Sequence, residues 1–450
     1  MKLLYLGLSF CSLTLLDFYL KVNIRGIGEG SLNLQVLALF FVLGGGLVLW
    51  RAGLSRLILV RRSILLLACF FAYFTVRIGF DTGSVEEIKA YLIATTGGVF
   101  LFYLLGTMVS ISIDQHQKYS LRSYDYFKFF AFFLLLYSCF TYTLLLSIFF
   151  DFTAKLRSDI FLIKGLNEGY QRSGDFLVIG YLILISLYVQ FYSLKQIKNS
   201  IFFRGVNIIV FTLLVINALT SMVIAQMMGS NKAVVLLAGL VLILTSVSLL
   251  LQVSRIQRYL AIRQLTFYRF ISGKIAVSLF TLIVILFFFL VLFVIVSAGY
   301  IGVDLAMTRL AGFGSHEISS VTSRLTLLDN FILHFSYSPV FGNMQVDCLT
   351  TGCGTYVHSF VGSSLTHTGI VGFFLLLGYF FLAYKERFET ITVSYGHPKF
   401  LLSNILNLYS VLFISAVLLI AIVGTFISWS VLWFSMGLYL NAVKFKEVYE

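Results

Sequence analysis

The sequence predicts an all-α protein embedded in a membrane. Of its 450 residues, 59% are hydrophobic and only 11% are charged, and the mean hydropathy of +0.97 is higher than a soluble core requires. Apolar runs of about 20 residues recur along the chain, and this is the length of a helix that crosses a bilayer. Because backbone groups in hydrocarbon must be satisfied within the segment, such runs favour helices over the alternating ten-residue pattern of a membrane barrel.

Twelve apolar runs predict transmembrane helices, and we expect them to form one membrane domain over residues 1–450. The first run follows Lys2 as a signal peptide would. It carries Asp17 and lacks a cleavage site of small residues, so we interpret it as a span. The predicted spans lie near residues 3–21, 31–50, 63–80, 90–113, 125–150, 175–193, 205–227, 233–253, 275–299, 359–384, 400–422 and 426–443.

The basic residues predict the orientation of these spans. When alternate loops are assigned to the two sides of the membrane, one side holds 21 of the 32 Lys and Arg residues. Basic and acidic residues nearly balance on the other side. Because positively charged loops stay in the cytoplasm, we expect both termini inside and the segments 151–174 and 300–358 outside. The net charge of +13 is thus a topology signal, and we expect no nucleic-acid partner.

The insert 300–358, between the ninth and tenth predicted spans, is the large outer loop. Cys348 and Cys353 lie in it. In an oxidising compartment they would form a local disulfide, and two free thiols are the alternative. A single cysteine pair predicts no metal site. The stretch from Arg309 to Gly372 also contains four of the six histidines, His316, His334, His358 and His367.

Cations kept on the outer face, against the usual bias, are candidates for binding anions. Arg157 and Arg172 lie in the segment 151–174, and Lys232 begins a predicted span after a short turn. A guanidinium offers a planar fork that matches phosphate oxygens, although a solvated loop balanced by nearby carboxylates is the alternative. A lysine at the positive end of a helix dipole favours an anionic ligand, unless it merely extends to the interface.

The insert itself combines a predicted amphipathic helix with a histidine at the membrane boundary. Arg324 opens an apolar pattern of helical spacing that would lie along the outer leaflet, and Pro339 ends it. His358 precedes the next span, where it is placed to act as a general base or as a simple interfacial residue. His367 lies inside that span, and we favour a neutral histidine bonded to Ser363 or to another helix over a functional group.

Nucleotide-driven chemistry is not indicated, because the sequence has no GxxxxGK[ST] loop, and the HExxH motif of zinc proteases is absent as well. Any reaction must therefore use substrates that are already activated, as polyprenyl diphosphate lipids are.

The order of these elements resembles the superfamily of O-antigen polymerases and O-antigen ligases. Its signature is commonly an Arg, then P-[ILV]-x-G, then His-Asn, then G-[IVL]-x-G. The corresponding elements here are Arg324, Pro339–Gly342, His358-Ser359 and Gly369–Gly372. A Ser-Arg pair that usually opens a span resembles Ser230-Asn231-Lys232. Two positions depart from the pattern: Ser359 replaces the Asn, and Lys232 replaces the Arg, so bidentate phosphate binding is not expected there.

The resemblance implies a GT-C-like, inverting, metal-independent glycosyltransferase of the bacterial inner membrane that needs no cofactor. It would use undecaprenyl-diphosphate-linked oligosaccharides as donor and acceptor on the outer face, with a chain-length regulator protein as a partner. Cations would stabilise the diphosphate leaving group. His358 would orient or deprotonate the acceptor hydroxyl, with Arg324 as the second catalytic residue. The diphosphate would be bound by Lys232, Arg172, Arg157 and Arg309.

Other functions remain open at this point. A polymerase that joins repeat units and a ligase that transfers glycan to lipid A-core are poorly separated by the sequence. A flippase or secondary transporter would place its charges in mid-span rather than in outer loops. A wall-synthesis polymerase would use an essential acidic residue in the large loop, where Asp304, Asp329 and Asp347 lie.

Overall fold

The computed structural model describes nine longer stretches of the chain, together with short pieces and single positions between them. Every regular element in these stretches is a helix, so the all-α prediction is confirmed for this part of the chain. The stretches are residues 62–81, 102–107, 130–142, 169–196, 201–227, 232–245, 329–353, 359–392 and 429–439. The labelled helices are α4 (Arg62–Asp81), α8 (Gly169–Gln196), α9 (Ile201–Met227), α13 (Val346–Thr350), α14 (Phe360–Thr392) and α16 (Ser430–Tyr439).

Two of the described helices are long and apolar enough to cross a membrane. They are Ser63–Asp81 in α4 and Phe360–Glu386 in α14, which match the spans predicted at 63–80 and 359–384. The remaining predicted spans are described in part or lie outside the described residues, so the count of twelve stays a prediction. Shorter apolar helices occur at Phe130–Tyr142, Leu177–Tyr188, Ile209–Ala225, Lys232–Thr245 and Ser430–Tyr439. Four of them lie inside a predicted span, and Lys232–Thr245 begins one residue before the span predicted at 233–253.

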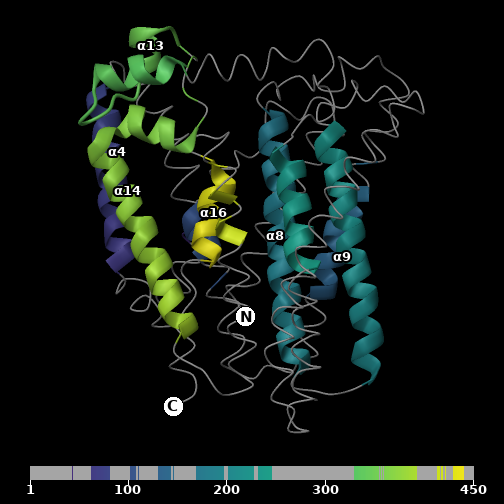
Figure 1. Cartoon of the computed structure of the whole chain (residues 1–450). Helices are drawn as coiled ribbons and strands as arrows, with labels where there is room; N and C mark the ends of the chain where they lie inside the picture. Colours follow the sequence, from purple (N-terminus) through teal and green to yellow (C-terminus); the bar gives the residue numbers. More distant parts are fainter. Residues whose placement is uncertain are drawn as a thin grey trace, which may run out of the picture.

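Helices α4 and α14 pack side by side in opposite directions (Figure 1). Near the start of α4, the Ser63 hydroxyl donates to Glu386 Oε2 over 2.7 Å, late in α14. Near the other end, the Tyr73 hydroxyl lies 2.9 Å from the carbonyl oxygen of Thr368, in the early part of α14. Large apolar side chains on both helices face outward, among them Phe80 at 81% exposure and Phe381 at 68%. Large exposed apolar side chains of this kind are expected of helices that contact lipid.

Aromatic side chains and their hydroxyl groups join the remaining helices. The buried Tyr181 hydroxyl of α8 donates to the carbonyl of Leu214 in α9 over 3.1 Å. Trp433 of α16 stacks on Phe70 of α4, with ring centroids 6.4 Å apart. A tyrosine body buries apolar area while its hydroxyl finds a backbone acceptor, so these contacts hold helices together without leaving a polar atom unsatisfied.

Helix 102–107 and α16 approach so closely that their backbones touch. A Cβ on Gly106 would come nearer than 3.0 Å to the backbone of Phe434, and one on Gly437 would come equally near to the backbone of Tyr103. Small residues facing each other in this way are typical of helices that pack inside a membrane, where van der Waals contact replaces the hydrophobic effect. The contact supports a membrane location for this helix pair.

Candidate functional site

The site is built where a turn at Pro339–Gly342 meets a break in α14. At Gly369 the backbone has φ 62° and ψ −171°, which interrupts the helical ladder. The N–H groups of Ile370 and Val371 therefore lose their usual partners four residues earlier. They donate instead to the carbonyls of Pro339 (2.9 Å) and Val340 (3.1 Å). The turn thus supplies the acceptors that the broken helix lacks.

The turn and α14 donate backbone hydrogen bonds to each other. The carbonyl of Thr366, which a continuous helix would pair with the N–H of Ile370, accepts the N–H of Asn343 over 3.0 Å. Gly342 adopts φ 70°, and a Cβ there would lie closer than 3.0 Å to the backbone of Gly369. A Cβ on Gly369 would meet the backbone of Gly342 in the same way. Only glycine fits both positions, since each combines a left-handed backbone with no room for a side chain. We call this junction the Gly342–Gly369 contact.

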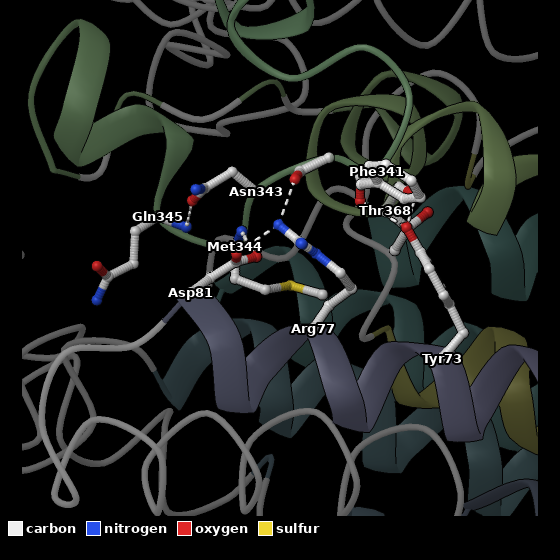
Figure 2. A network of polar contacts seen from close by, with 9 residues as sticks. Tyr73, Arg77, Asp81, Phe341, Asn343, Met344, Gln345 and Thr368 are labelled. Carbon is white, nitrogen blue, oxygen red and sulfur yellow. Dashed lines mark hydrogen bonds and ion pairs between the residues drawn. The ribbon is translucent and has the colours of Figure 1, made fainter.

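Helix α4 contributes a tyrosine and a charge pair to the Gly342–Gly369 contact (Figure 2). The Tyr73 hydroxyl lies 2.6 Å from the carbonyl oxygen of Phe341, in addition to that of Thr368. Arg77 donates through Nη2 to the carbonyl of Gly342 over 2.6 Å and pairs with Asp81. One helix thereby holds both the turn and the break in α14.

Asp81 completes the connection between α4 and the turn. Its side chain is only 6% exposed, and its Oδ2 accepts the backbone N–H of Met344 over 3.0 Å. A carboxylate in the last turn of a helix is disfavoured by the helix dipole, and an Arg four residues before an Asp is the weaker order for a helical pair. The pair is therefore explained by its contacts with the turn rather than by stabilisation of α4 itself.

The first half of α14 carries buried hydroxyl groups that bond to their own helix. Thr366 and Thr368 each donate to the carbonyl four residues earlier, at 3.0 and 2.7 Å. His367 Nδ1 lies 2.9 Å from the carbonyl oxygen of Ser363, which agrees with the predicted bonding of this histidine to Ser363. Hydroxyls that return to the preceding turn tend to bend helices, and here they immediately precede the break at Gly369.

The segment between Asp329 and α14 is closed by the disulfide Cys348–Cys353, so the structure selects the disulfide over free thiols. Residues 329–337 form a helix, which Pro339 ends as predicted. His334 on this helix is 1% exposed, and its Nε2 lies 2.8 Å from the hydroxyl oxygen of Thr351, inside the disulfide loop. Burial lowers the pKa of His334 below its usual value, while the nearby Asp347 carboxylate opposes this effect.

Ser359, which departs from the family pattern, has a local role. Its hydroxyl oxygen accepts the N–H of Gly362 over 3.3 Å. Since α14 begins at Phe360, this is the geometry of an N-cap, in which the side chain satisfies an N–H at the third helical position. Serine is among the best residues for this purpose, so the departure has a structural reason.

Most of the predicted site residues lie outside the part of the chain that the structure describes. Lys232 is the first described residue of the helix 232–245 and is half-buried. Arg172 lies in α8, at a position whose side chain is not described. The residues outside the described stretches are Arg157, Arg309, Arg324 and His358. Of the predicted elements, the structure brings together Pro339–Gly342 and Gly369–Gly372.

Sequence reasoning missed Tyr73, Arg77 and Asp81. A signal was available, because two ionisable residues in the last turns of an otherwise apolar span are costly and point to a specific partner. Together the fold and the site define a protein whose described part is α-helical and contains two helices able to cross a membrane, joined near one end by a glycine contact and a charge pair. Comparison with the profiles of known protein families finds no match, and comparison with curated proteins finds no significant similarity.

Proposed function

We propose that the protein is a glycosyltransferase that polymerises a bacterial surface polysaccharide on the outer face of the inner membrane. The observation that carries the proposal is the Gly342–Gly369 contact. Pro339–Gly342 and Gly369–Gly372, which resemble two elements of the polymerase and ligase signature, are about 30 residues apart and share reciprocal backbone hydrogen bonds. Elements that depend on each other for their geometry are expected to occur together in a functional unit.

In the proposed orientation, the Gly342–Gly369 contact lies on the outer face of the inner membrane. The disulfide Cys348–Cys353 lies in the same segment, and disulfides persist in oxidising compartments. The opposite ends of α4 and α14 are joined through Ser63 and Glu386, close to the basic residues Arg62 and Lys385. Basic residues at that end agree with a cytoplasmic location there.

In the proposed reaction, an acceptor sugar hydroxyl attacks the anomeric carbon of an undecaprenyl-diphosphate-linked glycan. The new glycosidic bond forms as the bond to the diphosphate oxygen breaks, and the configuration is inverted. His358 would accept the hydroxyl proton, and the diphosphate would leave with its charge stabilised by Arg324 and Lys232. Arg157, Arg172 and Arg309 are the further cations proposed for the diphosphate. A diphosphate leaves as a stable anion, so the chemistry requires neither a metal nor a nucleotide.

The test is the glycan pattern of cells that lack the protein, separated on a gel. The proposal predicts core carrying a single repeat unit, restored to long chains by the wild-type gene. Core with no repeat unit would favour the ligase. Long chains together with repeat units retained on the inner face would favour the transporter. If Arg324→Ala and His358→Ala chains, at normal protein level, still restore polymer of normal length, the proposed catalytic residues are wrong.

A further inference from the structure

The helix 329–337 keeps polar side chains on its inner side and large aliphatic side chains on its outer side. Asn330 is half-buried and His334 is buried, and both contact the segment around the disulfide at hydrogen-bond distance. Ile332, by contrast, is 76% exposed, and Leu333 is exposed as well. A helix on the surface of a soluble protein is expected to turn its apolar stripe toward the core. The arrangement here favours an apolar medium on the outer side.

The turn Pro339–Gly342 continues this outward apolar surface and connects it to α14. The side chains of Val340 and Phe341 are exposed, although the backbone of the turn is bonded to Ile370 and Val371. These two residues begin a row of exposed apolar side chains along α14, formed by Ile370, Val371, Phe374, Leu377 and Phe381. We use the name outer apolar face for the exposed side chains before the row, which are Ile332, Leu333, Tyr337, Val340 and Phe341.

The carbonyl groups of the turn all have donors on the two helices able to cross a membrane. Those of Pro339 and Val340 accept N–H groups of α14. That of Phe341 lies 2.6 Å from the Tyr73 hydroxyl, and that of Gly342 accepts Arg77 of α4. An exposed turn in water needs no such donors, because water supplies them. Beside hydrocarbon, non-helical backbone is tolerated only where its polar groups are satisfied, and these four carbonyls meet that requirement.

The sequence around the turn also lacks formal charge. No Asp, Glu, Lys or Arg lies between Asp329 and Asp347. Charged side chains are the most costly groups to bring into a bilayer, so this stretch is spared the largest cost of insertion. Tyr337, which is exposed at the end of the helix, is of the residue type that is enriched at the boundary between membrane and water.

We infer that the outer apolar face inserts into the membrane leaflet on the disulfide side, where it contacts the acyl chains of bilayer lipids. In the proposed orientation this is the outer leaflet. The sequence predicted an amphipathic helix on that leaflet, ending at Pro339, and the structure extends the lipid contact through the turn. Lipid is selected as the partner because the face adjoins the exposed row of α14, a helix able to cross a membrane.

The insertion sets the depth of the Gly342–Gly369 contact. Interfacial elements bury their apolar side chains about 5–10 Å into the boundary between headgroups and acyl chains. Because the turn belongs to both the outer apolar face and the Gly342–Gly369 contact, this contact lies at the same level. The inference rests on the membrane location of α4 and α14 and does not depend on the proposed reaction.

Nitroxide labels on single cysteines test the lipid contact in the full chain. Cys11, Cys69 and Cys139 are replaced by alanine, and the disulfide is retained. Ile332→Cys and Phe341→Cys are labelled in vesicles of phosphatidylethanolamine and phosphatidylglycerol, and folding is checked by the unfolding midpoint. Molecular oxygen concentrates among acyl chains, whereas a nickel chelate stays in water. We expect oxygen to relax both labels more strongly than the nickel chelate does.

Three further positions provide the standards. Phe374→Cys, in the exposed row of α14, is the standard for lipid, and Lys385→Cys, near the other end of α14, is the standard for water. Asp329→Cys is the matched control, because it is exposed on the same helix but polar in the wild type, and its label should be more accessible to the nickel chelate than the label at Ile332→Cys.

Two results would overturn the inference. If the nickel chelate relaxes the label of Ile332→Cys or Phe341→Cys more strongly than oxygen does, the outer apolar face lies in water. If neither reagent relaxes these labels, protein covers the face, as another segment of the chain or a second copy.

The wild-type chain provides the decisive measurement if a cysteine variant does not fold. A phospholipid with a photoactivated diazirine on its acyl chain is added to the same vesicles, and the adducts are located by mass spectrometry of peptides. We expect adducts on residues 332–341 and on the exposed row of α14. The disulfide loop, which lies on the inner side of the helix 329–337, should carry none. Adducts on α14 without any on residues 332–341 would overturn the inference.

Discussion

Replacing Gly369 by alanine tests how the break in α14 is built. A Cβ forces the residue out of its left-handed conformation, at about 1–2 kcal/mol, and it collides with the backbone of Gly342. Relief of the collision would separate the turn from α14. Three backbone hydrogen bonds would then be lost, at about 1 kcal/mol each. The free energy of unfolding should therefore fall by about 4–5 kcal/mol in total.

Two other glycines provide matched controls. Gly352 has φ 115°, but a Cβ there meets nothing within 4 Å, so Gly352→Ala should cost only the backbone strain of about 1–3 kcal/mol. Gly239 lies in the helix 232–245 with open space around it, and Gly239→Ala should gain about 0.5–1 kcal/mol of helix stability. The assay is unfolding of the purified full chain in mixed detergent micelles. If Gly369→Ala is no less stable than Gly239→Ala, the account of the Gly342–Gly369 contact is wrong.

Two further predictions concern charged and titratable groups. Arg77→Gln and Asp81→Asn should each lower the unfolding free energy by about 1–3 kcal/mol, because each leaves a partly buried partner without its bond. The double variant should cost less than the sum, and strict additivity in the same unfolding assay would show that the two side chains act independently. For His334, the folded state holds a lowered pKa, so below about pH 6.5 the unfolded chain binds the extra proton more readily. The free energy of unfolding should be retained above that pH and should decrease as the pH falls below it. This pH dependence should be weaker in His334→Gln, which removes the imidazole. If the slope of the unfolding free energy against pH is the same in His334→Gln as in the wild type, the prediction is wrong.

The sequence predicted the positions of helices better than their interruptions. The spans expected at 63–80 and 359–384 match α4 and α14 because long apolar runs leave the backbone little choice but a helix. The break at Gly369 was missed, since a single glycine is tolerated in a helix and its need for space depends on a turn 27 residues earlier. Pro339, by contrast, ends a helix for local reasons, and that prediction was confirmed.

The candidate site was predictable only where its chemistry is local. His367 was expected to bond to Ser363 or to another helix, and its Nδ1 contacts the carbonyl of Ser363, four residues away on the same helix. Arg77 and Asp81 look like an ordinary helical pair in the sequence, and only the folded chain shows that they hold Gly342 and Met344. The disulfide had an alternative in the sequence, because thiol spacing alone does not fix the distance between two cysteines.

The most direct test of the proposed function is reconstitution of the purified chain in liposomes. Undecaprenyl-diphosphate-linked repeat units extracted from cells that lack the protein serve as both donor and acceptor, with a chelator of divalent metals present. We predict a ladder of lipid-linked products that differ by one repeat unit and whose newly formed linkages are inverted relative to the donor. Repeat units that remain unjoined, with or without added metal, would contradict it.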